Sequence, residues 1–93
     1  MIERAKEICT KYAAFNEENI PFDALIFGNR TPIIAEARRV VFYVLYFENY
    51  GKKSQREISA LLNLKRCSAN YAVKMVRDRL RFDVSFANFI KSL

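Results

Sequence analysis

Two cations and three hydrogen-bonding side chains are concentrated in one short segment of this sequence. Lys65 and Arg66 come first, and Ser68, Asn70 and Tyr71 follow at once. Arginine and lysine bind phosphate oxygens and guanine edges, and hydroxyl and amide groups bind phosphates or bases. On one face of a helix, these side chains would have the chemistry to contact duplex DNA. The alternative is a solvated, charged helix end in an ordinary helix bundle.

The segment Ser54–Lys74 predicts the two helices that would position these side chains. Ser54 and Glu57 form the S-x-x-E pattern of a capping box, which marks a helix start. Asn63 follows an apolar stripe and is a plausible stop, because Asn tolerates the left-handed conformation. A second helix is predicted from residue 65 or 66. In such helix-turn-helix pairs the second helix often enters the DNA major groove.

Four further cations lie within or just before this helix pair and are predicted to hold phosphates. They are Lys52, Lys53, Arg56 and Lys74. The whole chain of 93 residues has 16 Lys or Arg and 10 Asp or Glu, a net charge of +6. Residues 1–29 hold three basic and five acidic residues and residues 30–93 hold thirteen and five, so that −2 and +8 give +6. This asymmetry predicts a one-sided surface for a polyanion, although a basic protein without such a partner has the same totals.

The fold class predicted is all-α: a single domain over residues 1–93, built as a small helix bundle with its helix-turn-helix at residues 54–81. Only two Gly and two Pro occur, and 52% of the residues are hydrophobic. Besides the pair, helices are predicted at residues 2–15, 21–25, 32–49 and 84–91, the last two capped by Thr31 and Asp83. The apolar run 40–47 favours a buried central helix, although alone it also fits a strand. Phe22, Leu25 and Phe27 are expected to pack the short helix against the core.

No pattern in the sequence indicates an enzyme, a metal site or a cofactor. There is no His, no Gly-rich phosphate loop and no pair of carboxylates on a predicted cleft. Cys9 and Cys67 alone cannot form a structural zinc site, and they suit a reducing cytosol. The N-terminus is too charged for a secretory signal, and no apolar run approaches the about 20 residues of a membrane span. We therefore expect a cytoplasmic, nucleoid-associated protein without a membrane partner.

The order of these parts resembles the C-terminal DNA-binding domain of DnaA, the bacterial chromosomal replication initiator. The likeness rests on Ile26–Arg39, Ser54–Leu62 and Arg66–Ala72, and it covers nearly the whole chain. It implies a Trp-repressor-like helix-turn-helix fold that binds a short duplex site through both grooves, in replication or transcription control. It also implies that Arg30 enters the minor groove and that Arg38 meets a phosphate.

The chain departs from that family at the signature R-D-H-[ST]-T of the recognition helix. Residues 64–68 read L-K-R-C-S, so Lys65 and Arg66 replace the Asp and His that help to read bases. The resemblance therefore implies the docking mode but not the family's target sequence. The AAA+ domain of initiators is absent from this sequence, which favours a stand-alone relative, such as one carried by a phage or mobile element.

Two other functions fit the same sequence. The bundle could dock on a replication or regulatory protein through Tyr43, Tyr46 and Tyr50, or through its acidic first helix. Stacked tyrosines could also bind single-stranded nucleic acid, but the sequence indicates no basic groove around them. No heptad seam is visible, so we expect a monomer or a weak dimer.

Overall fold

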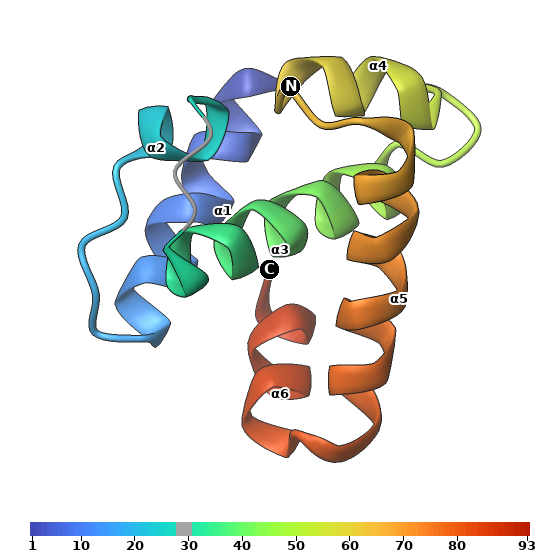
Figure 1. Ribbon diagram of the computed structural model, residues 1–93. Coiled ribbons are helices and arrows are strands. Elements are labelled where there is room, and N and C mark those ends of the chain that lie inside the picture. Colours follow the sequence, from blue (N-terminus) through green and yellow to red (C-terminus); the bar gives the residue numbers. More distant parts are fainter. Residues whose placement is uncertain (28–30) are drawn as a thin grey trace.

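The computed structural model describes residues 1–27 and 31–93, which contain six helices and no strand. In chain order they are α1 (Ile2–Phe15), α2 (Phe22–Ile26), α3 (Pro32–Glu48), α4 (Gln55–Leu61), α5 (Arg66–Phe82) and α6 (Val84–Ser92) (Figure 1). The predicted small all-α helix bundle is confirmed, and the helix boundaries lie close to those read from the sequence.

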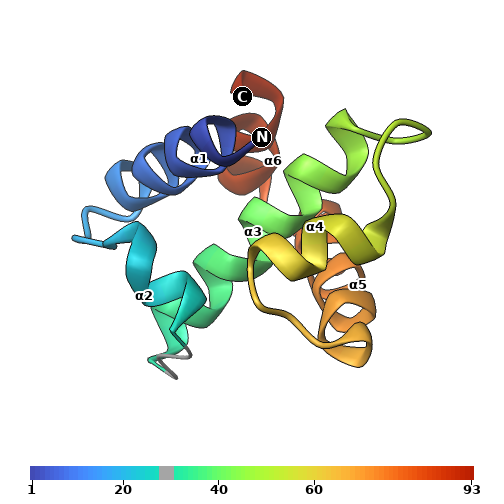
Figure 2. The same ribbon diagram turned by 90° about the horizontal axis from the view of Figure 1, so that it is seen from above.

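Helix α3 passes through the middle of the bundle, with α1 and α2 on one side and α4 and α5 on the other (Figure 2). It begins at Pro32, whose fixed φ suits a first helical turn. It ends before Asn49, and Gly51 then adopts a φ of +81°, as a chain reversal requires. The side chains of Val41, Phe42 and Leu45 are completely buried, so the predicted central helix forms the main wall of the core.

Two details of the expected core were wrong. Phe27 is 82% exposed, because α2 ends at Ile26 and only its Leu25 side is turned into the core. Helix α3 is also not buried on every side: Phe47, in its last turn, is exposed, and Tyr43 and Tyr46 are only partly buried. The neighbouring helices cover α3 along most of its length but leave part of its C-terminal end open.

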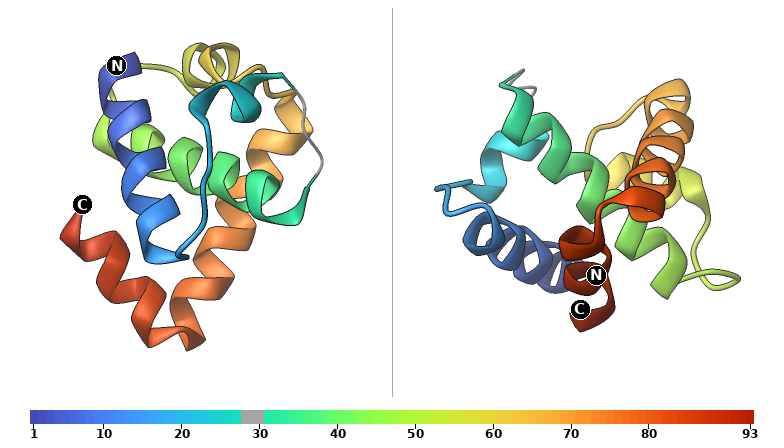
Figure 3. Two further views of the ribbon diagram at one scale, coloured as in Figure 1. Left: turned by 90° about the vertical axis from the view of Figure 1, so that its left-hand side faces the viewer. Right: turned by 90° about the horizontal axis from the view of Figure 1, so that it is seen from below.

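Helix α6 folds back against α1 and α5 and closes the lower end of the bundle (Figure 3). Tyr12 of α1 is completely buried, and its ring lies 5.7 Å from that of Phe89 and 6.4 Å from that of Phe86. Its hydroxyl accepts a hydrogen bond of 2.9 Å from Arg79 Nη1, and Arg79 Nε donates to Asp83 Oδ2 at 3.2 Å. These contacts join α1, the end of α5 and the start of α6.

A four-residue connection turns the chain from α4 to α5. Ser54 Oγ accepts from the N–H of Glu57, and the Glu57 carboxylate accepts from the N–H of Ser54, so the predicted capping box is present. Asn63 has a φ of +55°, as expected for a left-handed stop, and its Nδ2 donates to the carbonyl of Ile26. Leu62, which precedes it, is completely buried. Burial of Leu62 and the hydrogen bond of Asn63 therefore fix the first half of this connection.

Replacing Ser54 with alanine should lower the free energy of unfolding by about 1 kcal/mol, because the substitution removes the N-cap acceptor of α4. Urea denaturation of the purified proteins measures this change. Thr10→Ala, at an exposed position within α1, is the matched control and should change stability much less. Equal losses in the two variants would contradict the capping role of Ser54.

Candidate nucleic-acid interface

The start of α5 places two basic residues in succession. Lys65 is its N-cap and Arg66 its first residue, both are exposed, and the first turn contains no acidic residue. No side chain caps this end, whereas Ser54 and Asp83 cap α4 and α6. Free N–H groups at a helix start favour an anion. The two cations beside them oppose the helix dipole, and a bound anion would offset this unfavourable interaction.

An open hollow lies between α4 and this end of α5. Its polar rim contains Arg56 and Arg66, and Ser59 and Ala60 lie on the α4 side. Gln55 Nε2 donates a hydrogen bond of 2.9 Å to Asn70 Oδ1, which ties the two helices together across the hollow. Of the predicted site residues, the structure thus brings Arg56, Arg66 and Asn70 together around one concave surface.

The other predicted residues of α5 lie on its outer side or flank. Lys74 and Tyr71 are exposed, and Ser68 is half-buried. The guanidinium of Arg39, from α3, lies 5.1 Å from the centre of the Tyr71 ring. This distance is within the range of a cation–π contact, which restrains the ring of Tyr71 and keeps a positive charge next to α5.

Lys52 and Lys53 lie in the connection between α3 and α4. The backbone N–H groups of both residues donate to the carbonyl of Asn49 at 2.9 Å, so the turn that carries them is internally bonded. Lys53 Nζ lies 3.8 Å from Glu57 Oε2, an exposed and therefore weak ion pair. The two lysines add to the positive charge beside the start of α4.

Arg38 has a structural environment that the sequence did not reveal. Its Nε donates to the carbonyl of Leu25 at 2.5 Å, and its Nη2 lies 3.5 Å from the carbonyl of Ala24. These carbonyls belong to the last turn of α2, where helix carbonyls have no partner within the helix. Burial, and secondarily the charge of Arg39, lowers the pKa of Arg38. Arg38 therefore fastens α2 to α3; the predicted minor-groove residue Arg30 lies outside the described residues.

Positive charge predominates in the segment that contains α4 and the first half of α5. Residues 52–74 contain six Lys or Arg and one acidic residue, Glu57, a difference of +5. Apart from the pair of Lys53 with Glu57, no cation of this segment has a carboxylate of a described residue within ion-pair distance. The cations without such a partner are Lys52, Arg56, Lys65, Arg66 and Lys74.

Two further cations extend this charge along α5 and were missed at the sequence level. Arg77 and Arg81 are exposed and follow Arg66 by 11 and 15 residues, which places them on nearly the same side of the helix. The guanidinium of Arg77 lies 5.5 Å from the centre of the Phe47 ring. The spacing of these two arginines from Arg66 was the signal available in the sequence.

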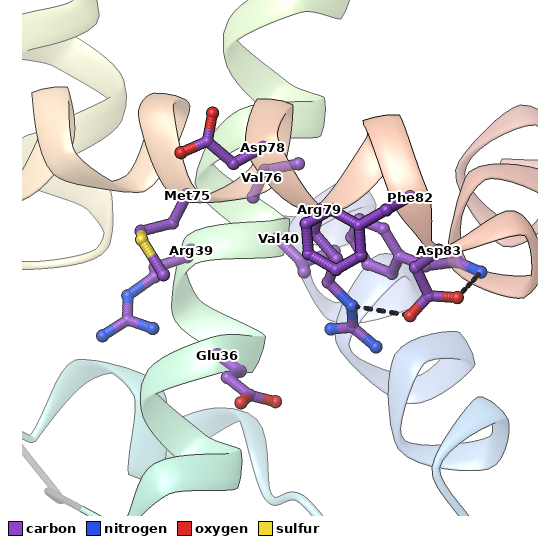
Figure 4. Close-up of a pocket in the computed structure, with 10 residues that line it drawn as sticks. Glu36, Arg39, Val40, Met75, Val76, Asp78, Arg79, Phe82 and Asp83 are labelled. Atoms are coloured by element: carbon purple, nitrogen blue, oxygen red, sulfur yellow. Dashed lines mark hydrogen bonds and ion pairs between the residues drawn. The ribbon is translucent and has the colours of Figure 1, made fainter.

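A more apolar pocket lies elsewhere, between α3, α5 and the start of α6 (Figure 4). Val40, Val76 and Phe86 form its buried floor, and Arg79 and Asp83 lie on its wall. The two wall residues are bonded to each other, and Arg79 also covers the Phe86 ring at 4.0 Å. These contacts indicate that the pocket belongs to the packing of the α5–α6 corner.

Asp83 makes the stability of this corner depend on pH. Its Oδ1 accepts from the N–H of Phe86, and this bond, followed by Arg79, lowers the pKa of the carboxyl group. The stabilisation is therefore present above the ordinary pKa of Asp, about 3.9, and is lost as the pH falls through the lower folded-state value. The melting temperature of the wild type should therefore fall as the pH is lowered through that acidic range. Asp83→Asn has no carboxyl group at this position, so its melting temperature should fall less over the same range. An unchanged acid profile in the variant would contradict this role.

The fold and this surface define a small all-α protein with a basic helix pair on its outside. Comparison with protein-family models, curated proteins and solved structures finds no match. None of the helices in residues 1–27 and 31–93 has the length and apolarity to span a bilayer. The same residues contain no group of three or more His, Cys, Asp or Glu side chains arranged to hold a metal ion.

Proposed function

We propose that this protein binds double-stranded DNA with a sequence preference, through the start of α5. The observation that carries the proposal is the hollow between α4 and α5, where Arg56, Arg66 and Asn70 meet at an uncapped, basic helix end. A groove-binding helix needs exposed donors in its first turns and a neighbouring helix that meets the DNA backbone. The exposed donors at the start of α5 and the position of α4 beside them support this proposal.

In this proposal the first residues of α5 enter the major groove. The major groove is about 12 Å wide, and α5, with 17 residues, is about 25 Å long, so a helix that enters with its N-terminal end places only its first turns in the groove. Arg66 would reach a guanine edge, with Ser68, Asn70 and Tyr71 next along the helix. Lys65 would lie at the phosphates that border the groove.

The flanking cations would hold the DNA backbone and supply affinity without sequence information. Lys52, Lys53 and Arg56 would act on the α4 side, and Lys74 on α5. Arg77 and Arg81 would lie beyond the width of the groove, where phosphates are the available partners. The resemblance to the DnaA domain adds Arg30 as a minor-groove contact and favours a monomer in replication or transcription control.

The experiment that tests this proposal is selection from a random duplex pool, followed by affinity measurements at two salt concentrations. Each phosphate contact should contribute about 0.9 to the slope of log affinity against log salt. An enriched sequence together with a steep slope supports the proposal. A steep slope without enrichment reduces the function to nonspecific binding, and binding that salt does not weaken contradicts it. Lys6→Ala, on the exposed side of α1, is a matched charge control and should leave the slope unchanged.

A further inference from the structure

The aromatic end of α3 forms a second hollow next to the proposed duplex surface. Tyr46 and Tyr50 line one side of it, and Gly51, Lys52 and Lys53 line another. Tyr50 is 70% exposed, and its ring is nearly parallel to that of Phe47, with an interplanar angle of 9° and centroids 6.4 Å apart. A large aromatic surface is thus open to solvent beside two lysines.

We propose that this hollow binds an unpaired nucleobase, so that the protein prefers duplex DNA that adjoins a single strand. An exposed aromatic ring offers a flat face on which any base can stack, and adjacent cations bind the phosphates of the same strand. Both features occur here within one hollow. The sequence alone indicated no basic groove around the tyrosines, but the turn after α3 places Lys52 and Lys53 beside them.

Hydrogen bonds fix the backbone of the turn that carries the two lysines. The N–H groups of Lys52 and Lys53 both bond to the carbonyl of Asn49, and Asn49 Nδ2 bonds to the carbonyl of Leu45. Tyr46 meets Tyr50 edge to face, with ring centroids 5.9 Å apart, which supports the exposed ring from one side. The exposed ring and the backbone of the turn are therefore held in place by contacts with the C-terminal end of α3.

The hollow is continuous with the proposed duplex surface. Ser54 and Gln55 line both this hollow and the one between α4 and α5. In Figure 2 the connection between α3 and α4 leads directly into α4. A strand that leaves the duplex at Arg56 would reach Tyr50 along this edge. The inference rests on the proposed function for its duplex part but not for its single-stranded part.

Three fluorescent oligonucleotides test the inference: a blunt duplex, the same duplex with an oligothymidine overhang, and the oligothymidine alone. The wild type should bind the overhang duplex about tenfold more tightly than the blunt one, a typical gain for one stacked base. Tyr50→Ala should abolish this gain and leave blunt-duplex affinity unchanged, and Tyr50→Phe should retain it because the ring remains. Circular dichroism confirms that each variant is folded.

The outcomes separate the inference from the proposed function. Blunt-duplex binding without a gain from the overhang overturns the inference and leaves the proposed function intact. A gain that persists in Tyr50→Ala also overturns it, because the base must then lie elsewhere. Binding of oligothymidine that depends on Tyr50, without any duplex binding, would overturn the proposed function and support the hollow as a base site.

Discussion

Arg66→Ala should relax the sequence preference of the protein for DNA by about 1–3 kcal/mol, roughly 5- to 150-fold in relative affinity. Arg66 is the first residue of α5, it is exposed, and it lies on the rim of the hollow between α4 and α5. A bidentate arginine–guanine contact distinguishes G from other bases, so its loss raises affinity for the wrong sequences relative to the selected one. Competition between the selected duplex and single-base variants of it measures this change.

Lys53→Ala is the contrasting variant. Its ammonium is expected to meet a phosphate, so all duplexes should weaken by about the same factor, and the salt slope should decrease by about 0.9. The ion pair of Lys53 with Glu57 is exposed, and its loss should have little effect on folding. If Arg66→Ala weakened every duplex equally, as Lys53→Ala does, Arg66 would be a backbone contact and not a base contact.

Tyr12→Ala should lower the free energy of unfolding by about 3–5 kcal/mol, a large part of the about 5–15 kcal/mol typical of a small domain. The ring is completely buried among aromatic side chains of α1 and α6. Its removal leaves a cavity where α1, α5 and α6 meet and also removes the acceptor of Arg79. Urea denaturation followed by circular dichroism measures the loss.

Two matched variants separate packing from hydrogen bonding at this position. Tyr12→Phe keeps the ring and removes only the hydroxyl, and it should cost about 0.5–1.5 kcal/mol because Arg79 retains its bond to Asp83. Tyr71→Ala removes a ring of the same size from an exposed position and should cost much less than Tyr12→Ala. Similar losses for Tyr12→Ala and Tyr71→Ala would contradict the assignment of Tyr12 to the core.

Most local signals in the sequence were confirmed because each depends on neighbouring residues, although the side chain of Thr31 makes no capping hydrogen bond to α3. Ser54 with Glu57 fixed the start of α4, and Asp83 fixed the start of α6. Asn63 adopted the left-handed conformation expected of a helix stop. The candidate cations on the helix pair could be placed for the same reason, since helical spacing decides which side of α5 a residue occupies.

The candidate site also depends on distances that the sequence does not encode. Arg38 was predicted to meet a phosphate, and the structure adds contacts between its guanidinium and the carbonyls at the end of α2. The sequence indicated no role for Arg39, but its guanidinium lies over the ring of Tyr71, which is 32 positions later in the chain. Which cations remain available to a ligand is decided by such contacts between helices.

The sequence by itself determined the all-α class, the order of the helices and the excess of positive charge around α4 and α5. Helical periodicity and capping act over one or two turns, so a linear pattern is sufficient for these features. Only the tertiary structure decided that Phe27 lies at the surface, that Tyr50 stays open beside Lys52, and that Arg56 and Arg66 border one hollow. These features depend on how separate helices pack against one another. The pattern of one helix does not specify which other helix its face will contact, because that is decided when the whole core packs.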